Sequence, residues 1–213
     1  MAKTEGHFPG ALIRQGVVSV VEGEHIAHWE LANAIYHVSF HLADSVPTSQ
    51  LLAWREARRE FAVRRTANPA GELSPEEIAE FRRLYDERIE RYLTAGHGCC
   101  ALRTPGLAER VAKVFEHGHG VTHDLHVLMI MPNHVHVIAA LLPGHEMKKV
   151  VDGWKSVSAH LIAKSSGMKA PIWQPDHYSR IIRTPEEYQR QDRYVWYNPE
   201  SARLTSGFFR KRY

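Results

Sequence analysis

Two patterns of hydrophobic and polar positions divide this chain of 213 residues into strands and helices. Runs rich in β-branched and aliphatic residues predict strands. Apolar residues that recur at i, i+3, i+4 and i+7 predict amphipathic helices. The predicted strands cover residues 34–42, 122–130, 134–142 and 172–182. The predicted helices cover residues 48–65, 74–94, 104–117, 146–165 and 184–198.

Local residues support several of these boundaries. A Ser or Thr followed by Pro opens three of the helices, which is typical of an N-cap and a first helical position; the pairs are Ser74-Pro75, Thr104-Pro105 and Thr184-Pro185. The short segment 131–133 is the expected turn between two neighbouring antiparallel strands. The order of the elements predicts an α+β domain with a mostly antiparallel sheet and helices on one or both faces.

The overall composition narrows the class of protein. A length of 213 residues with 44% hydrophobic content fits one elaborated globular domain or two small ones. No stretch approaches the roughly 18 consecutive apolar residues of a membrane span, and the first ten residues lack a signal-peptide pattern. We therefore expect a cytoplasmic protein. Cys99 and Cys100 are adjacent, so they offer neither a loop-closing disulfide nor paired metal-ligand spacing.

Charge is unevenly distributed along the chain. The net charge of +3 says little about partners by itself. Residues 1–147 carry a net −4, whereas residues 148–213 carry a net +7. A basic last third is consistent with an anionic partner, although a solvated basic helix face explains the charge equally well.

Two histidines stand out within one predicted strand. Because strand side chains alternate between the two faces, His134 and His136 point the same way and Val135 and Val137 point the other way. This arrangement suits two ligands of one divalent metal. In a chain with 15 histidines, a chance His-x-His is equally plausible from the tripeptide alone.

A second candidate lies in the last predicted helix. Arg190, Tyr194 and Asn198 are spaced i, i+4 and i+8, so they share one helix face. A tyrosine hydroxyl can attack a phosphodiester when the scissile phosphate is activated. A divalent metal can provide that activation, with the amide oxygen of Asn198 as an oxygen ligand. A packing role for Tyr194 is the alternative.

Several strings in order resemble one family, the single-tyrosine HUH transposases, and within it the REP-associated tyrosine transposases. The strings are LADSVP at 42–47, AGHG at 95–98, MPNHVHVI at 131–138, WKS at 154–156, WQ at 173–174, RYV at 193–195 and NP at 198–199. The resemblance extends from about Ile35 to Leu204. It implies one HUH domain over residues 1–213 with a ferredoxin-like α+β core and a helical insertion at about 48–94.

The resemblance also implies an activity. Such proteins cleave and rejoin single-stranded DNA by transesterification. The positions that match their motifs are His134, His136 and Asn198 for Mg²⁺ or Mn²⁺, and Tyr194 for the nucleophile. Tyr194 would become linked to a 5′ phosphate and leave a free 3′ hydroxyl.

DNA is the partner that the resemblance implies, in the form of single strands or hairpins from repetitive extragenic palindromes. The basic region 148–213 fits this partner, with Lys148, Lys149, Lys155 and Arg190 as the predicted DNA contacts. A monomer and a homodimer both remain open. So do a DNA-clamping role and a purely structural role for the insertion.

Two other functions compete with strand transfer. One is a domesticated single-stranded DNA-binding protein without cleavage activity, against which the intact set of His134, His136, Tyr194 and Asn198 argues. The other is a histidine-triad nucleotide hydrolase, or a zinc hydrolase of the His-x-His-x-Asp type, but Ile138 occupies the position that needs a third His or an acid. Among the other tyrosines considered as nucleophiles, none has an asparagine four positions later.

Overall fold

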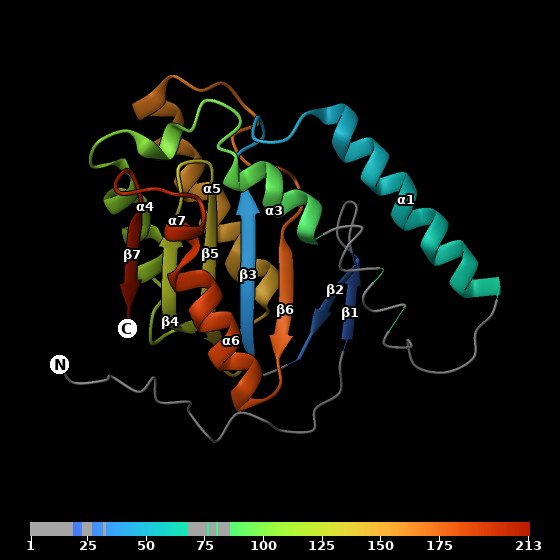
Figure 1. The fold of residues 1–213 in the computed structure, drawn as a ribbon. Helices are drawn as coiled ribbons and strands as arrows, with labels where there is room; N and C mark the ends of the chain where they lie inside the picture. The colour runs from blue at the N-terminus through green and yellow to red at the C-terminus, as the bar shows by residue number, and fades with distance from the viewer. Residues whose placement is uncertain (1–18, 23–26, 32, 68–75, 77–79, 81–85) are drawn as a thin grey trace.

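A five-stranded antiparallel sheet forms the centre of the molecule (Figure 1). The structure is a computed structural model that describes residues 19–22, 27–31, 33–67, 76, 80 and 86–213. The strands of the sheet are β3 (Ile35–His41), β4 (His123–Ile130), β5 (His134–Leu141), β6 (Tyr178–Ile182) and β7 (Phe209–Arg212). Their order across the sheet is β6-β3-β5-β4-β7. A separate pair consists of β1 (Ser19–Glu22) and β2 (Ala27–Glu30).

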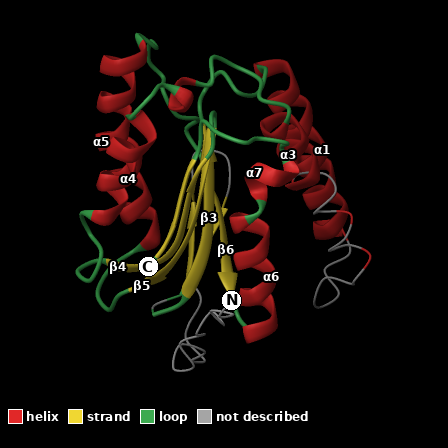
Figure 2. Ribbon diagram, turned by 60° about the vertical axis from the view of Figure 1, so that its left-hand side comes forward, coloured by secondary structure: helices red, strands yellow, loops and turns green. Residues whose placement is uncertain are grey.

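Helices cover both faces of this sheet. The described helices are α1 (Thr48–Ala67), α3 (Asp86–Thr94), α4 (Leu107–Glu116), α5 (Met147–Ser166), α6 (Pro185–Trp196) and the short α7 (Asn198–Ser201). Figure 2 shows α4 and α5 on one side of the sheet, and α6, α7 and α3 on the other. The expected arrangement of an antiparallel sheet between helices is therefore confirmed.

The core of the fold is a βαββαβ unit. It runs β3, α4, β4, β5, α5 and β6, and its strands lie side by side in the order fourth, first, third and second. This is the ferredoxin-like arrangement, so the predicted fold class is confirmed. Helix α6 and strand β7 are additions to it. The description of residues 1–213 as one domain stays a prediction.

The two faces of β5 differ as the alternation of its residues predicts. All eight residues of β5 are buried. Val135 and Val137 belong to the apolar core under α4 and α5, which also contains Phe40, Phe115 and Trp154. Burying such side chains contributes about 1.5–3 kcal/mol each. The opposite face holds His134 and His136, and its apolar residues pack against α6.

Two of the predicted elements, one helix and one strand, differ clearly from the structure. The helix predicted from Thr104 begins at Leu107 with Gly106 as N-cap, because Thr104 instead ends the short 3₁₀ helix η1 (Ala101–Arg103). The strand predicted over 172–182 is reduced to β6 and an isolated bridge between Trp173 and Leu42. Pro175 lies between the two parts and cannot donate a backbone hydrogen bond to a neighbouring strand.

The bounds of the other predicted helices agree with the structure to within two residues where it describes them. Helix α6 opens as expected, because the Thr184 side chain accepts a hydrogen bond from the Glu187 backbone. It ends at Trp196, so Asn198 begins a new helix, α7. The predicted start at Ser74 lies outside the described residues. None of the described helices has the length and apolar character that a membrane span requires.

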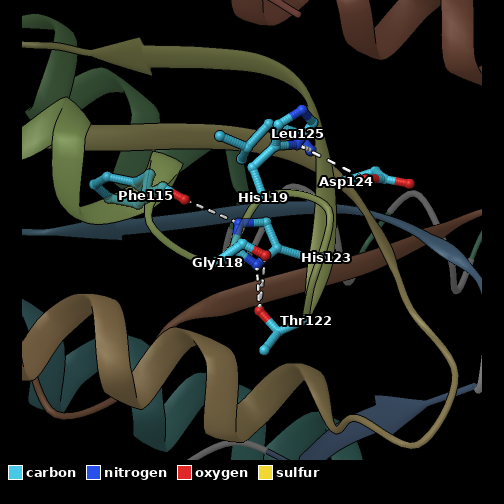
Figure 3. Close-up of polar contacts among 7 residues, drawn as sticks. All are labelled: Phe115, Gly118, His119, Thr122, His123, Asp124 and Leu125. Carbon is cyan, nitrogen blue, oxygen red and sulfur yellow. Dashed lines mark hydrogen bonds and ion pairs between the residues drawn. The ribbon is translucent and has the colours of Figure 1, made fainter.

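A compact turn connects α4 to β4 (Figure 3). His123 contacts the Phe115 carbonyl oxygen through Nε2 at 3.0 Å and the Thr122 hydroxyl through Nδ1 at 2.8 Å. A carbonyl oxygen only accepts, so Nε2 carries the proton and the ring satisfies a carbonyl at the end of the helix. A Cβ at Gly118 would lie 2.6 Å from the Thr122 hydroxyl, so this approach requires glycine.

Candidate active site

His134 and His136 lie side by side on the α6 face of the sheet, at the end where α3 and α7 lie (Figure 1). His134 pairs with His41 of β3, and His136 pairs with Ser39. Both imidazoles are fully buried, and their ring centroids are 4.8 Å apart. The structure therefore brings the two predicted ligands together on one face.

Asn133 fixes the orientation and the protonation of His134. Its amide nitrogen donates to the backbone carbonyls of Leu93 and His97 at 3.3 and 3.0 Å, which leaves its amide oxygen facing His134. That oxygen lies 2.7 Å from Nδ1 of His134 and only accepts hydrogen bonds. Nδ1 therefore carries the proton, and Nε2 of His134 presents a lone pair. This is how a residue outside the metal ligands orients a histidine.

A similar relay orients His136. The amide nitrogen of Asn198 lies 3.4 Å from Nε2 of His136, so this Nε2 is an acceptor. Nδ1 then carries the proton and faces Nε2 of His37 at 3.2 Å. His37 in turn hydrogen-bonds the side chain of Gln191 on α6. His134 and His136 therefore both direct an unprotonated Nε2 toward Asn198.

Burial keeps these histidines neutral. It lowers the pKa of His136 from 6.5 to about 3. Burial also lowers the pKa of His37 and of His134 well below 6.5, and the neighbouring His136 lowers both further. A neutral imidazole is the form that binds a metal, so the histidines need not lose a proton first at pH 7.

Two buried polar atoms in the site have no hydrogen-bond partner among the residues that the structure describes. They are Nε2 of His134 and Oδ1 of Asn198. A polar contact with Asn198 partly offsets the lowered pKa of His134, so the two side chains are neighbours. An unsatisfied buried acceptor costs about 1–3 kcal/mol. A divalent cation would satisfy both atoms, so the residues present fit a metal.

Tyr194 lies at the border between this buried group and solvent. Its side chain is 39% exposed. Its ring packs edge-on against His37 and His136, with centroids 5.8 and 5.5 Å away. Its hydroxyl hydrogen-bonds Glu90. The predicted nucleophile is thus both next to the histidine pair and accessible to a large substrate.

Glu90 is a site residue that the sequence analysis missed. It lies on α3, and its Oε1 is 3.6 Å from Nε2 of His136. The ligand atoms of Glu90, His134 and His136 all lie within 4.8 Å of one another. Burial raises the pKa of Glu90, and hydrogen bonds from Tyr194 and Asn198 partly offset this. In the sequence, Glu90 is one acid among many in an Arg/Glu-rich segment, so spacing gave no signal for it.

The predicted DNA contacts do not gather at the site. Lys148, Lys149 and Lys155 lie on α5, which is across the sheet from α6 (Figure 2). Lys148 and Lys149 pair with acids of the same helical region, and Lys155 donates to backbone carbonyls of the loop after Trp173. Arg190 lies exposed on α6, the helix of Tyr194. DNA contact by these four residues stays a prediction.

Two of the strings quoted above meet beside the site. The side chain of Asp44 accepts a hydrogen bond from the Cys99 backbone at 2.7 Å. A Cβ at Gly98, whose φ is +86°, would lie 2.8 Å from the Asp44 carbonyl oxygen. This close approach holds the loop that follows α3, and the same loop provides the His97 carbonyl for Asn133. The loop therefore supports the orientation of His134.

Comparison with known families identifies the region that contains most of the site. Residues 103–198 match the sequence model of the family described as IS200-like transposases. This is just under half of the chain, and it contains His134, His136, Tyr194 and Asn198. Glu90 lies before it. The resemblance to single-tyrosine transposases is confirmed for this part of the chain. No curated protein matches the chain.

Two solved structures are similar to this one at low identity. One is a REP-associated tyrosine transposase bound to a REP hairpin; it is 14% identical, with 82% of this chain and 71% of that chain covered and a TM-score of 0.44. The other is a candidate transposase from Deinococcus radiodurans R1, 14% identical, with 79% and 93% covered and a TM-score of 0.38. Neither likeness bears on mechanism or substrate.

Proposed function

Because the chain contains an IS200-like transposase region with His134, His136, Tyr194 and Asn198, we propose that this protein is a metal-dependent single-stranded DNA transesterase. Tyr194 is the nucleophile. His134, His136 and Asn198 hold Mg²⁺ or Mn²⁺. The substrate class is single-stranded or hairpin DNA of the REP type, as the sequence resemblance implies.

One observation carries the proposal: a partly exposed tyrosine side chain lies beside two buried acceptor atoms that have no hydrogen-bond partner in the described part of the chain. Tyr194 is 39% exposed, and neither Nε2 of His134 nor Oδ1 of Asn198 has a hydrogen-bond partner among the described residues. A protein that only packed these side chains would gain nothing from leaving two buried acceptors unsatisfied. The combination suits a nucleophile next to a cation.

The residues of the chain have distinct roles in this reaction. A bound divalent metal would act as a Lewis acid on a phosphate oxygen. The edge-on contacts with His37 and His136 hold the Tyr194 ring in place. Asn133 and His37 hold the histidine rings so that each Nε2 keeps its lone pair. The site is therefore preorganised before DNA arrives.

The reaction exchanges one phosphodiester bond for another. The Tyr194 oxygen forms a bond to phosphorus, and the bond between phosphorus and the 3′ oxygen breaks. The products are a 5′-phosphotyrosine and a DNA strand with a free 3′ hydroxyl, so the tyrosine proton ends on the leaving oxygen. The reverse reaction with another 3′ hydroxyl would rejoin DNA, which is the strand transfer that a transposase needs.

A DNA-binding protein without strand transfer is the alternative, and no feature of the described site favours it. The nucleophile is exposed rather than packed away, and the histidines keep the neutral form that a metal needs. A protein that only bound DNA would require neither property.

A covalent-adduct assay tests the proposal. Purified protein is incubated with Mn²⁺ and a hairpin-bearing single strand labelled on the 3′ side of the cleavage site, and labelled protein is measured after denaturation. Wild-type protein should retain label, and Tyr194→Phe should lose the adduct while still binding DNA. Tyr197→Phe is the matched control, because Tyr197 is 54% exposed and only three positions away. An adduct of undiminished yield with Tyr194→Phe would contradict the proposal.

A further inference from the structure

We propose that Glu90 is a fourth ligand of the metal site, so that the helical insertion contributes directly to the active site. This inference rests on the proposed function, which requires a metal. It adds to the metal site a ligand from outside residues 103–198, the region that matches the family model. It also gives the insertion a chemical role, because Glu90 lies on α3.

The geometry places the Glu90 carboxylate among the other ligand atoms. Its Oε1 is 3.6 Å from Nε2 of His136, and its ligand atom lies within 4.8 Å of those of both histidines. Atoms that share one cation lie at about such separations, because each metal–ligand bond is roughly 2.0–2.3 Å long. The side chain of Glu90 also hydrogen-bonds Asn198. All four candidate ligands are therefore mutual neighbours.

The unpaired atoms next to Glu90 point independently to a ligand. Nε2 of His134 and Oδ1 of Asn198 are buried, on residues that are 0% and 3% exposed, and no described residue hydrogen-bonds either atom. A hydrogen bond from Glu90 cannot satisfy them, because an ionised carboxylate only accepts. A cation would satisfy both atoms and the carboxylate together.

The chemistry of the ligand set also favours an acid. Two neutral imidazoles and one amide bring no negative charge to a divalent ion. Mg²⁺ prefers oxygen ligands and is usually held by one or two carboxylates. Glu90 is the one carboxylate among the described residues that groups with the two histidines. Four protein ligands would leave two positions of an octahedral ion for phosphate oxygens.

A cleft gives substrate access to Glu90. It has a volume of about 530 Å³ and lies between α3 and the end of α7. Glu90 and Arg91 line one side, and Arg203 lines the other. An anionic strand that entered this cleft would lie between two arginines and beside the Glu90 carboxylate. With a bound cation, the Glu90 carboxylate at this position would help to attract a phosphate by holding that cation. Without a cation, the same carboxylate would repel the phosphate.

Metal binding by the full chain without DNA tests the inference. Free Mn²⁺ is measured by electron paramagnetic resonance during titration of wild-type protein, Glu90→Gln, Glu90→Asp and Glu109→Gln. Loss of the charge should weaken Mn²⁺ binding at least ~10-fold in Glu90→Gln. Glu90→Asp, which keeps the charge, should fall between this variant and wild type. Glu109→Gln is the control, because Glu109 is exposed on α4 and should bind as wild type.

The outcomes separate this inference from the proposed function. Mn²⁺ affinity of Glu90→Gln within twofold of wild type would overturn the ligand role, even if wild-type protein forms the DNA adduct. Equal loss in Glu90→Asp and Glu90→Gln would also overturn it. Thermal unfolding in excess chelator shows whether each variant is folded. Mn²⁺ binding is measured without DNA, so a failed adduct assay leaves this measurement interpretable.

Discussion

The two faces of strand β5 have the same burial and opposite character. Val135 and Val137 face α4 and α5 in an apolar core. His134 and His136 face α6, equally buried, and are linked to other polar side chains. The apolar face gains free energy from removing hydrocarbon from water. The histidine face gains less free energy from burial, because its imidazoles are polar and must stay neutral when they are buried.

This difference separates stability from chemistry within one sheet. The α4/α5 face can stabilise the fold without any ligand. The α6 face contains a histidine relay, an exposed tyrosine and two acceptors that no described residue hydrogen-bonds. Changes on the first face should therefore alter the free energy of unfolding, whereas changes on the second should alter metal binding and cleavage. The predictions that follow test this separation.

The largest effect is expected from His136→Ala. Loss of a proposed metal ligand should reduce metal-dependent DNA cleavage ~10³-fold or more, since a Lewis acid contributes several kcal/mol to the barrier. The variant should still unfold cooperatively. Cleavage assays with Mn²⁺, together with thermal unfolding, measure both properties. Cleavage that continued in excess chelator would show that the metal has no role.

On the other face, Phe115→Ala should act on stability alone. Phe115 is fully buried and packs against Phe40 and Trp154, with centroids 6.2 and 4.9 Å away. Truncation should lower the free energy of unfolding by about 3–5 kcal/mol. Denaturant unfolding gives this value, and Mn²⁺ affinity of the folded protein should not change. A large loss of Mn²⁺ affinity at temperatures where the variant is folded would contradict the separation between a stabilising face and a metal-binding face.

Acid should weaken the fold through the histidine face. Burial lowers the folded-state pKa of His41 to about 4 and of His136 to about 3, whereas both are 6.5 in the unfolded chain. The unfolded chain therefore binds more protons below pH 6.5, and stability falls as the pH drops toward 4. Each histidine contributes about 2 kcal/mol to this loss between pH 6.5 and pH 5.

Denaturant unfolding in excess chelator at both pH values measures this loss. The raised pKa of Glu90 acts in the opposite direction, because its folded form takes up a proton first. Phe115→Ala should keep the same pH dependence, while His136→Ala should flatten it. If the free energy of unfolding of His136→Ala fell with pH as steeply as that of wild type, burial of this imidazole would not control the pH response.

A smaller effect is expected from Asn133→Ala. The side chain orients His134 and joins it to the backbone after α3. Its removal should weaken Mn²⁺ binding ~10–100-fold, as is typical of a residue that orients a metal ligand. Titration with Mn²⁺ measures this change. Ser45→Ala is a control, because the Ser45 hydroxyl donates to the backbone carbonyl of Asn133 rather than to its side chain. Equal losses in the two variants would argue for a general effect on the turn.

Much of this arrangement could be predicted from the sequence. The alternation in 134–137 gave the two faces of β5 correctly, and the order of strands and helices gave the fold class. The i+4 spacing placed Asn198 near Tyr194, although the helix breaks between them at Tyr197. These features depend on neighbours in sequence or on periodicity, which a single chain reveals directly.

Features that depend on contacts between distant segments could not be predicted. Glu90 is 44 and 46 positions from the two histidines, and its role depends on where α3 packs. Asn133 was recognised only as part of a motif, since its partners lie in another segment. The sequence analysis assigned the lysines of α5 to DNA contact because they share a basic region with Tyr194. Which side of the sheet they occupy depends instead on the face against which α5 packs.

The most direct test of the account is to locate the covalent bond. Wild-type protein is reacted with Mn²⁺ and a cleavable hairpin oligonucleotide, digested with trypsin and nuclease, and analysed by mass spectrometry. The account predicts a nucleotide attached through its 5′ phosphate to Tyr194, and its absence when His136 is replaced by Ala. Attachment at Tyr178 or Tyr197 instead, or cleavage without any attached nucleotide, would contradict it.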